Sequence, residues 1–330
     1  WHQGDLDPDQ FWKEVFTELN ETGISQCLIL NYYFVDPVSA KISKKSQFNS
    51  NHSPKIPFLE KAMQLAPAHN IKASLYPVLE IDNPHQIGAI WRGNLNFFGI
   101  TLKNFFNEYS RLIMELAQIS VNNNAQYIYL GSELASLTHN IAARPFWEQL
   151  LYDLHSLNIK GSTKMTYAAH WEEYLTFPFW RQLDSIGIDA YFPLASAQQS
   201  AGINNPSLSQ IAANLKPQMS EFYNFARQHQ RPLHLSEFGL TPFDQATTTP
   251  WQQSPSYLKD ESERLNSFKA LLNCLENEVE DSNHLRIKNQ PWLSSVNFWH
   301  WKLPGRNGSN YNIEPGSDVA RLIKNYSEKK

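Results

Sequence analysis

The chain has 330 residues and a formal net charge of -4, with 42% hydrophobic and 18% charged residues. This composition is typical of a globular protein and excludes a disordered chain, and the length fits either one large domain or two small ones. Because the charge is weakly negative, the chain has no basic field for nucleic acid or anionic lipid, and we expect neither as a partner.

Several targeting and cofactor signals are missing from the sequence. No apolar run approaches the roughly 20 residues of a membrane helix, and no signal peptide opens the chain. A start at Trp1 instead of Met is typical of a trimmed N-terminus, which favours a periplasmic or secreted protein. Cys27 and Cys274 lie too far apart in sequence to suggest a zinc site or a disulfide scaffold. We expect a monomer without a cofactor.

Short apolar segments rich in branched and aromatic residues predict seven strands. In chain order they are 27–34, 71–81, 127–133, 164–171, 185–192, 232–239 and 295–301. Apolar residues at helical spacing predict helices over 7–23, 56–70, 102–120, 146–158, 208–230 and 261–280. The alternation of strand and helix predicts parallel strands joined by right-handed crossovers.

Such an alternation fits an open doubly wound sheet or a closed barrel. No GxGxxG or GxxxxGK[ST] motif follows any predicted strand, so the phosphate-binding loops of open nucleotide-binding sheets are missing. We therefore predict an α/β protein, a (β/α)8 TIM barrel, with one catalytic domain over residues 1–330. Because the first predicted helix begins at residue 7, we expect the first strand of the barrel either to end near residues 1–3 or to lie before this chain. The polar segments 196–216 and 241–261 are predicted as long loops.

Two predicted strands end in a glutamate, and strand ends are where a barrel builds its active site. Glu133 closes "YIYLGSE" and Glu237 closes "PLHLSE". Either residue alone could be a solvated carboxylate or the partner of an arginine. Together they suit glycosidic cleavage, in which one carboxyl protonates the leaving oxygen and the other attacks or activates water.

Aromatic and polar residues near the strand ends are candidates for sugar binding, because sugars stack on aromatic faces. The chain is rich in such residues, with 10 Trp, although any single Trp could equally fill the core. Asp189 is also compatible with a structural carboxylate that is bonded to the backbone. The candidate substrate-binding residues are Trp91, Arg92, Ser132, His170, Trp171, Asp189, Tyr191, Trp299 and Trp301.

Four segments, "YIYLGSELASL", "FWRQLDSIGIDAYFPL", "LHLSEFGL" and "VNFWHW", resemble glycoside hydrolase family 113, a member of the retaining clan A of (β/α)8 glycosidases. The resemblance implies that Glu133 is the general acid/base and Glu237 the nucleophile. It also implies that Trp299 is the platform beneath the sugar and that Tyr191 sits against the nucleophile. The implied substrates are β-1,4-mannan or manno-oligosaccharides. Ser132 departs from the clan, which usually has Asn before the acid/base.

Three other readings remain open. The first is a carbohydrate-binding barrel without activity, and the second is a glycosidase for a 2-amino or 2-acetamido exopolysaccharide. The third is a metal-dependent barrel hydrolase, which needs converging His and Asp ligands. His2, His170, His234 and His300 form no His-x-His pair, so we expect no catalytic metal. A retaining mechanism requires the two carboxyl groups to lie about 5–5.5 Å apart.

Overall fold

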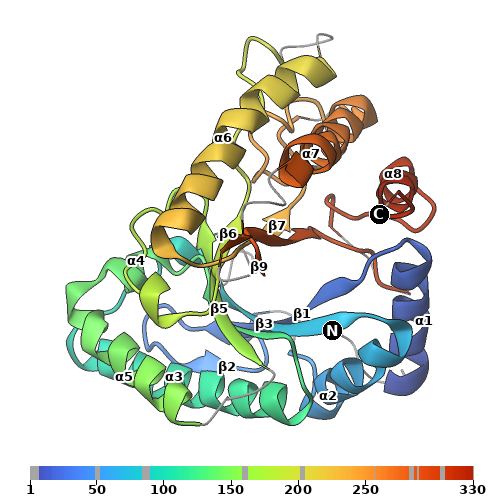
Figure 1. Ribbon diagram of the computed structural model, residues 1–330. Coiled ribbons are helices and arrows are strands. Elements are labelled where there is room, and N and C mark those ends of the chain that lie inside the picture. Colours follow the sequence, from blue (N-terminus) through green and yellow to red (C-terminus); the bar gives the residue numbers. More distant parts are fainter. Residues whose placement is uncertain are drawn as a thin grey trace. The chain divides into compact units, whose positions relative to one another are not determined.

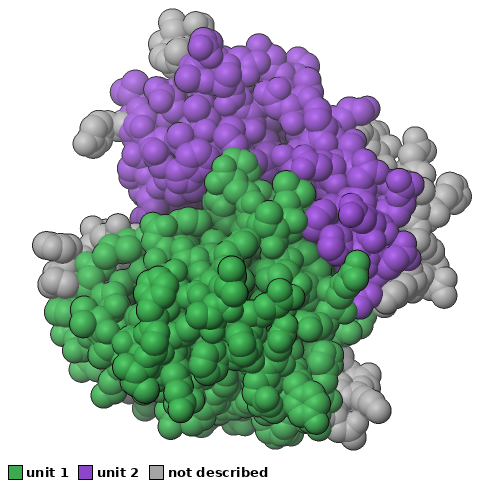
Figure 2. All heavy atoms as spheres, turned by 90° about the vertical axis from the view of Figure 1, so that its left-hand side faces the viewer, with its two compact units in different colours: residues 1–13, 26–187 green, residues 14–25, 188–330 purple. Residues whose placement is uncertain are grey.

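A computed structural model describes most of the chain. The described residues are 7–48, 53–83, 90–157, 163–200, 205–256, 258–281, 286–287, 290–304 and 309–329. The chain divides into two compact units, residues 1–13 with 26–187 and residues 14–25 with 188–330 (Figure 2). The strand end expected near residues 1–3, and His2, lie outside the described residues. A single catalytic domain over residues 1–330 stays a prediction.

The first unit is built on parallel strands, and four of the predicted strands are confirmed there. In sheet order they run β5, β4, β3, β1, with a short β2 at the edge. Their bounds are β1 (Gln26–Val35), β2 (Ile42–Ser43), β3 (Lys72–Ile81), β4 (Tyr127–Ser132) and β5 (Lys164–His170). β1 pairs with β3 in parallel along its whole length, while the two-residue β2, which was not predicted, pairs antiparallel with β1.

The longer helices of the first unit lie along one side of its strands (Figure 1). They are α2 (Ile56–Leu65), α3 (Gly99–Asn122) and α5 (Arg144–Ser156). The unit also contains the short helix α4 (Ala135–His139) and the 3-10 turns η1 (Ala66–His69), η2 (Arg92–Asn94), η3 (Ile141–Ala143) and η4 (Trp180–Gln182). α3 and α5 meet through Phe106 and Trp147, whose rings pack edge to face at 5.4 Å. Trp147 thus fills the core of the unit, which is the alternative to sugar binding that the sequence analysis allows for any single Trp. Among the described residues, no helix combines the length and the apolar character needed to cross a membrane.

The second unit carries the remaining predicted strands. They are β7 (Leu233–Phe238) and β10 (Leu293–Phe298), which pair in parallel, and the end of β6 (Ile186–Asp189), the strand in which the chain leaves the first unit. The unit also holds α6 (Leu208–His229), α7 (Glu261–Asp281), α8 (Asp318–Ser327) and the short antiparallel pair β8 (Arg286–Ile287) and β9 (Gln290–Pro291). The boundary between the units also falls within α1 (Pro8–Glu21).

α6 and α7 pack against each other in the second unit (Figure 1). α6 begins with a capping box between Ser207 and Gln210, which satisfies backbone groups at the helix start. Phe268 of α7 covers the two strands, since its ring meets Phe238 of β7 at 5.5 Å and Phe298 of β10 at 5.4 Å. The core of this unit therefore fixes the strand that carries Glu237.

Candidate active site

Glu133 follows β4 directly and has a left-handed backbone with a φ of 52°. That conformation costs a non-glycine residue on the order of 1–3 kcal/mol and persists only where its surroundings impose it. The Glu133 N–H donates to the carbonyl of Ala168 at 2.8 Å, and the N–H of Leu134 donates to the Tyr167 hydroxyl at 2.5 Å. β5 therefore holds the turn that presents Glu133.

The glycine of "GSEL" is required by the same turn. Gly131 has a φ of 153°, and a Cβ atom there would come within 2.5 Å of the Tyr109 hydroxyl oxygen. Tyr109 uses that hydroxyl to donate to the carbonyl of Leu130. Any side chain at position 131 would therefore displace the hydrogen bond that fixes the end of β4.

The Glu133 carboxylate is held by two donors from one short turn. Trp91 Nε1 and Arg92 Nη1 both donate to Glu133 Oε2 at 2.9 Å. Arg92 also donates through Nη2 to Glu80 Oε1 at 2.7 Å and through Nε to the carbonyl of Leu79 at 3.0 Å. Charge-assisted bonds of this kind are stronger than neutral ones. Arg92 thus links a glutamate of β3 to the glutamate that follows β4.

Aromatic rings surround this carboxylate. The rings of Trp91 and His170 lie 4.9 Å apart, and those of His170 and Trp171 lie 5.4 Å apart. Gly93 makes room for Trp91, because a Cβ atom at position 93 would approach the indole to 2.3 Å. Burial lowers the pKa of His170 although the negative charge of Glu133 opposes this. The structure therefore brings Trp91, His170 and Trp171 together beside Glu133.

Glu173 is a buried carboxyl that the sequence analysis missed. Burial raises its pKa to about 7 against the effect of its hydrogen bonds. It accepts from Thr138 Oγ1 at 2.7 Å, from the Tyr167 hydroxyl at 3.1 Å and from the N–H of His170 at 3.2 Å. Tyr167 in turn receives the N–H of Leu134, so Glu173 supports the turn that carries Glu133.

Glu237 lies in β7 of the second unit and is 7% exposed. The Tyr191 hydroxyl donates to its Oε2 at 2.7 Å, and the N–H of Ala190 donates to its backbone carbonyl at 2.7 Å. Burial, reinforced by the charge of Glu237, raises the pKa of Tyr191 well above its usual range. Tyr191 therefore keeps its proton at neutral pH and remains a donor to this carboxylate.

Tyr311 is a second residue that the sequence analysis missed. Its ring meets the ring of Tyr191 edge to face at 6.0 Å, and its hydroxyl donates to the carbonyl of Pro250 at 2.5 Å. Tyr311 comes from the segment after the last predicted strand. That segment has no strand or helix pattern to mark it, so only the fold places it beside Tyr191.

Trp299 and Trp301 follow β10 in the second unit. The Trp299 N–H donates to the carbonyl of Phe238, and a Cβ atom on Gly239 would come within 2.4 Å of the Trp299 carbonyl oxygen. Gly239 therefore lets the end of β7 approach Trp299 closely. Trp301 Nε1 donates to Glu18 Oε2 at 3.1 Å, which fixes its indole against α1.

The two remaining candidates have almost no exposed surface. Ser132 is 1% exposed and ends β4, while Asp189 is completely buried at the end of β6. Ser132 directly precedes Glu133. Asp189 lies two residues before Tyr191, which donates to Glu237. Their contact with a substrate stays a prediction.

Comparison with known proteins identifies the chain. A family model for Glycoside Hydrolase Family 113 matches residues 4–312. The chain belongs to glycoside hydrolase family 113. It is therefore a clan A glycoside hydrolase, and the resemblance found in its sequence is confirmed. No curated protein matches the chain.

Solved structures of family 113 share the fold. A structure described as a family 113 β-1,4-mannanase complex has a TM-score of 0.74 at 16% identity, covering 97% of this chain and 94% of that one. The family 113 β-mannanase AaManA from Alicyclobacillus acidocaldarius, in complex with ManMIm, has a TM-score of 0.74 at 14% identity, with 99% and 95% covered. A family 5 mannosidase from Rhizomucor miehei has a TM-score of 0.56 at 10% identity, with 96% and 86% covered. The predicted (β/α)8 fold class is thereby confirmed.

Proposed function

We propose that this family 113 enzyme is a retaining β-glycosidase that hydrolyses β-1,4-mannan or manno-oligosaccharides. The observation that carries the proposal is the family match over residues 4–312, which includes both strand-end glutamates. The mannanase names belong to the solved structures that the chain resembles, and they support the choice of sugar.

The reaction is a double displacement. Glu237 attacks the anomeric carbon and forms a glycosyl ester while Glu133 gives its proton to the leaving oxygen. Glu133 then takes a proton from water, which attacks the same carbon and releases Glu237. Trp299 supports the sugar ring from below. One complete cycle of the two steps returns both carboxyl groups to their starting protonation states, and neither step needs a metal ion or cofactor.

The hydrogen-bond donors around the two carboxyl groups support these roles, because they hold each carboxyl group in one orientation. The Tyr191 hydroxyl donates to Oε2 of Glu237 and fixes the direction of the carboxylate. Trp91 and Arg92 both donate to Oε2 of Glu133. Rigid placement of this sort keeps the reacting groups in attack geometry.

The test is hydrolysis of purified manno-oligosaccharides, with the first-formed anomer followed by NMR. The proposal predicts that the β-anomer of the new reducing end appears first and then mutarotates. Initial release of the α-anomer contradicts a retaining mechanism. Binding of manno-oligosaccharides by calorimetry without any turnover identifies the inactive carbohydrate-binding barrel instead. Parallel assays on β-glucans and on 2-acetamido glycans test the choice of sugar.

A further inference from the structure

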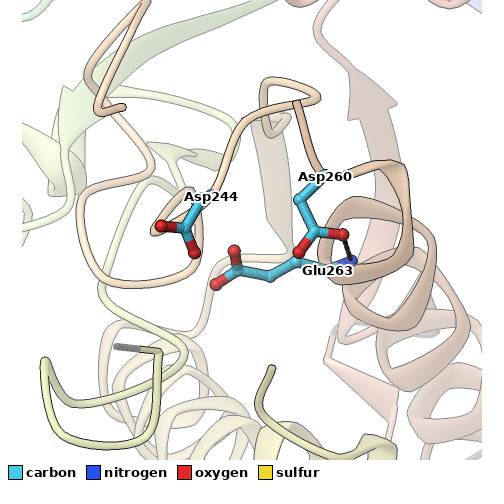
Figure 3. A group of neighbouring side chains, drawn as sticks. All are labelled: Asp244, Asp260 and Glu263. Atoms are coloured by element: carbon cyan, nitrogen blue, oxygen red, sulfur yellow. Dashed lines mark hydrogen bonds between the residues drawn. The ribbon is translucent and has the colours of Figure 1, made fainter. Parts of the chain in front are cut away.

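Three carboxylates that the proposed reaction does not use meet in the second unit (Figure 3). Asp244 lies in the irregular segment after β7, Asp260 lies at its end, and Glu263 lies in the first turn of α7. One carboxylate oxygen from each of the three falls within 4.8 Å of the others. Figure 3 shows the carboxylates of Asp244 and Glu263 pointing toward each other.

Two of these carboxylates are buried and each leaves one oxygen unsatisfied. Glu263 is 0% exposed and Asp244 is 4% exposed. Glu263 Oε2 and Asp244 Oδ1 have no hydrogen-bond partner among the residues that the structure describes. Among the described residues, no Lys, Arg or His forms an ion pair with any of the three carboxylates. Burial of ionised carboxylates without a compensating charge is strongly unfavourable, and a bound cation would remove that cost.

The remaining oxygens are used to orient the cluster. Glu263 Oε1 accepts from Ser200 Oγ at 2.6 Å, from the N–H of Thr247 at 3.2 Å and also from Thr247 Oγ1. Asp260 Oδ1 accepts from the N–H groups of Ser262 at 2.9 Å and of Glu263 at 3.3 Å, as a cap on α7. These bonds fix the carboxylates of Glu263 and Asp260, and they leave Glu263 Oε2 available for a ligand.

We propose that Asp244, Asp260 and Glu263 bind one divalent cation, with Ca²⁺ as the best match. The donors are all carboxylate oxygens, a set that suits hard cations better than zinc, because zinc sites in proteins generally include His nitrogen or Cys sulfur ligands. Ca²⁺ takes about 6–8 oxygens in flexible geometry and accepts water for the rest. Asp260 is only half-buried, which gives water a way to the cation.

Such an ion would tie the segment 241–260 to the start of α7. Within this segment the carbonyl of Thr247 accepts from the N–H of Leu194, and the carbonyl of Pro250 accepts from the Tyr311 hydroxyl. The ion is therefore structural in this proposal and takes no part in the glycosidase chemistry. The proposal stands independently of the proposed function.

The experiment begins with the full chain treated with a chelator and dialysed. Isothermal titration with CaCl2 is expected to give one site per chain. Ca²⁺ at about 100 times its Kd should raise the melting temperature by about 4 °C, and Mg²⁺ at the same concentration should raise it less. Asp244→Asn and Glu263→Gln should each remove both effects. The matched control is Glu261→Gln, because Glu261 is an exposed carboxylate in the same turn and should keep both effects.

A wild-type chain that takes up no Ca²⁺, or whose melting temperature does not respond to it, overturns the proposal. So does Ca²⁺ binding that persists unchanged in both substituted chains. If the variants do not fold, limited proteolysis of the wild type decides. Ca²⁺ should suppress cleavage between residues 241 and 260, and cleavage there that is equal with Ca²⁺ and with chelator contradicts the site.

Discussion

The two glutamates are held in different ways. Glu133 has a left-handed backbone just beyond β4, and its carboxylate accepts from the charged Arg92, which also binds Glu80. Glu237 lies inside β7, where the pairing with β10 shifts register, and accepts from the neutral hydroxyl of Tyr191.

This difference indicates how each site should fail. The position of Glu133 depends on a strained turn, which neighbouring residues support through buried polar contacts. Changes near Glu133 should therefore affect stability as well as rate. The position of Glu237 depends mainly on strand pairing, so changes of its side chain or of Tyr191 should affect rate and leave the fold intact.

The largest effect is expected from Glu237→Ala. Loss of the nucleophile should lower kcat by at least about 10³-fold, and azide should restore part of the activity by forming a glycosyl azide. The melting temperature should stay close to wild type, because the strand pairing is unchanged. Glu221→Ala, at an exposed position on α6, is the control and should be fully active. Near-normal activity of Glu237→Ala would falsify its role.

Glu133→Ala should lower turnover of unactivated oligosaccharides by about 10²- to 10⁴-fold, because the leaving oxygen loses its proton donor. Aryl glycosides with acidic leaving groups need no such proton and should be cleaved at a much smaller loss. The measurement is kcat for a series of aryl mannosides of increasing leaving-group pKa. An equal loss across the whole series would show that Glu133 does not act as the acid.

Glu173→Gln tests the buried support of the Glu133 turn. The folded pKa of about 7 lies above the usual value of 4.5, so the folded state binds more protons between these values. The free energy of unfolding should therefore fall as pH rises from about 4.5 to about 7, by about 3 kcal/mol in total.

The variant lacks this titration, so its unfolding free energy should not show that fall. Urea unfolding of both proteins at pH 5, 6, 7 and 8 measures the difference between them. If the two proteins keep the same difference at every pH, the carboxyl of Glu173 is not buried as described.

Tyr191→Phe removes one hydrogen bond to the Glu237 carboxylate. Hydrogen bonds to charged groups are worth about 1.5–3 kcal/mol, so kcat should fall by about 10- to 100-fold with little change in KM. Because Tyr191 acts through Glu237, the rate of azide rescue in Glu237→Ala should be the same with or without the Tyr191 hydroxyl. A variant that has a higher KM but an unchanged kcat argues against this positioning role.

Ser132→Asn should have the smallest effect. Serine is shorter than the Asn of clan relatives and carries one donor instead of two, so we expect more room at the sugar's 2-position and poor use of β-glucosides. The variant should shift kcat/KM toward aryl β-glucoside over β-mannoside by about 10-fold or less. Melting curves control for overpacking, since Ser132 is buried. A wild type that prefers glucoside and does not shift on substitution refutes the idea.

The strands and both glutamates could be predicted because each glutamate follows a short apolar run, a pattern that needs only local sequence. Arg92 was found as a candidate, but its partner Glu80 was not, because Glu80 sits within the apolar strand "PVLEI" and pairs with a residue 12 positions on. Tyr311 could not be predicted, because no strand or helix pattern in the sequence around it marks it as part of a site.

The acidic cluster was missed for a related reason. Asp244 and Asp260 lie in a segment predicted only as a polar loop, and a metal site was expected only where His and Asp ligands converge. Carboxylates that converge from a loop and a helix start have no characteristic spacing. Only the folded chain brings them together.

The most direct test of the central claim is to trap the covalent intermediate. Wild-type protein is incubated with 2-deoxy-2-fluoro-β-mannosyl fluoride, which slows release of the glycosyl-enzyme, and is then digested for tandem mass spectrometry. The account predicts one 2-fluoromannosyl group per chain, attached to the Glu237 side chain. A label on Glu133, or full turnover of mannan by a chain that is never labelled, would contradict it.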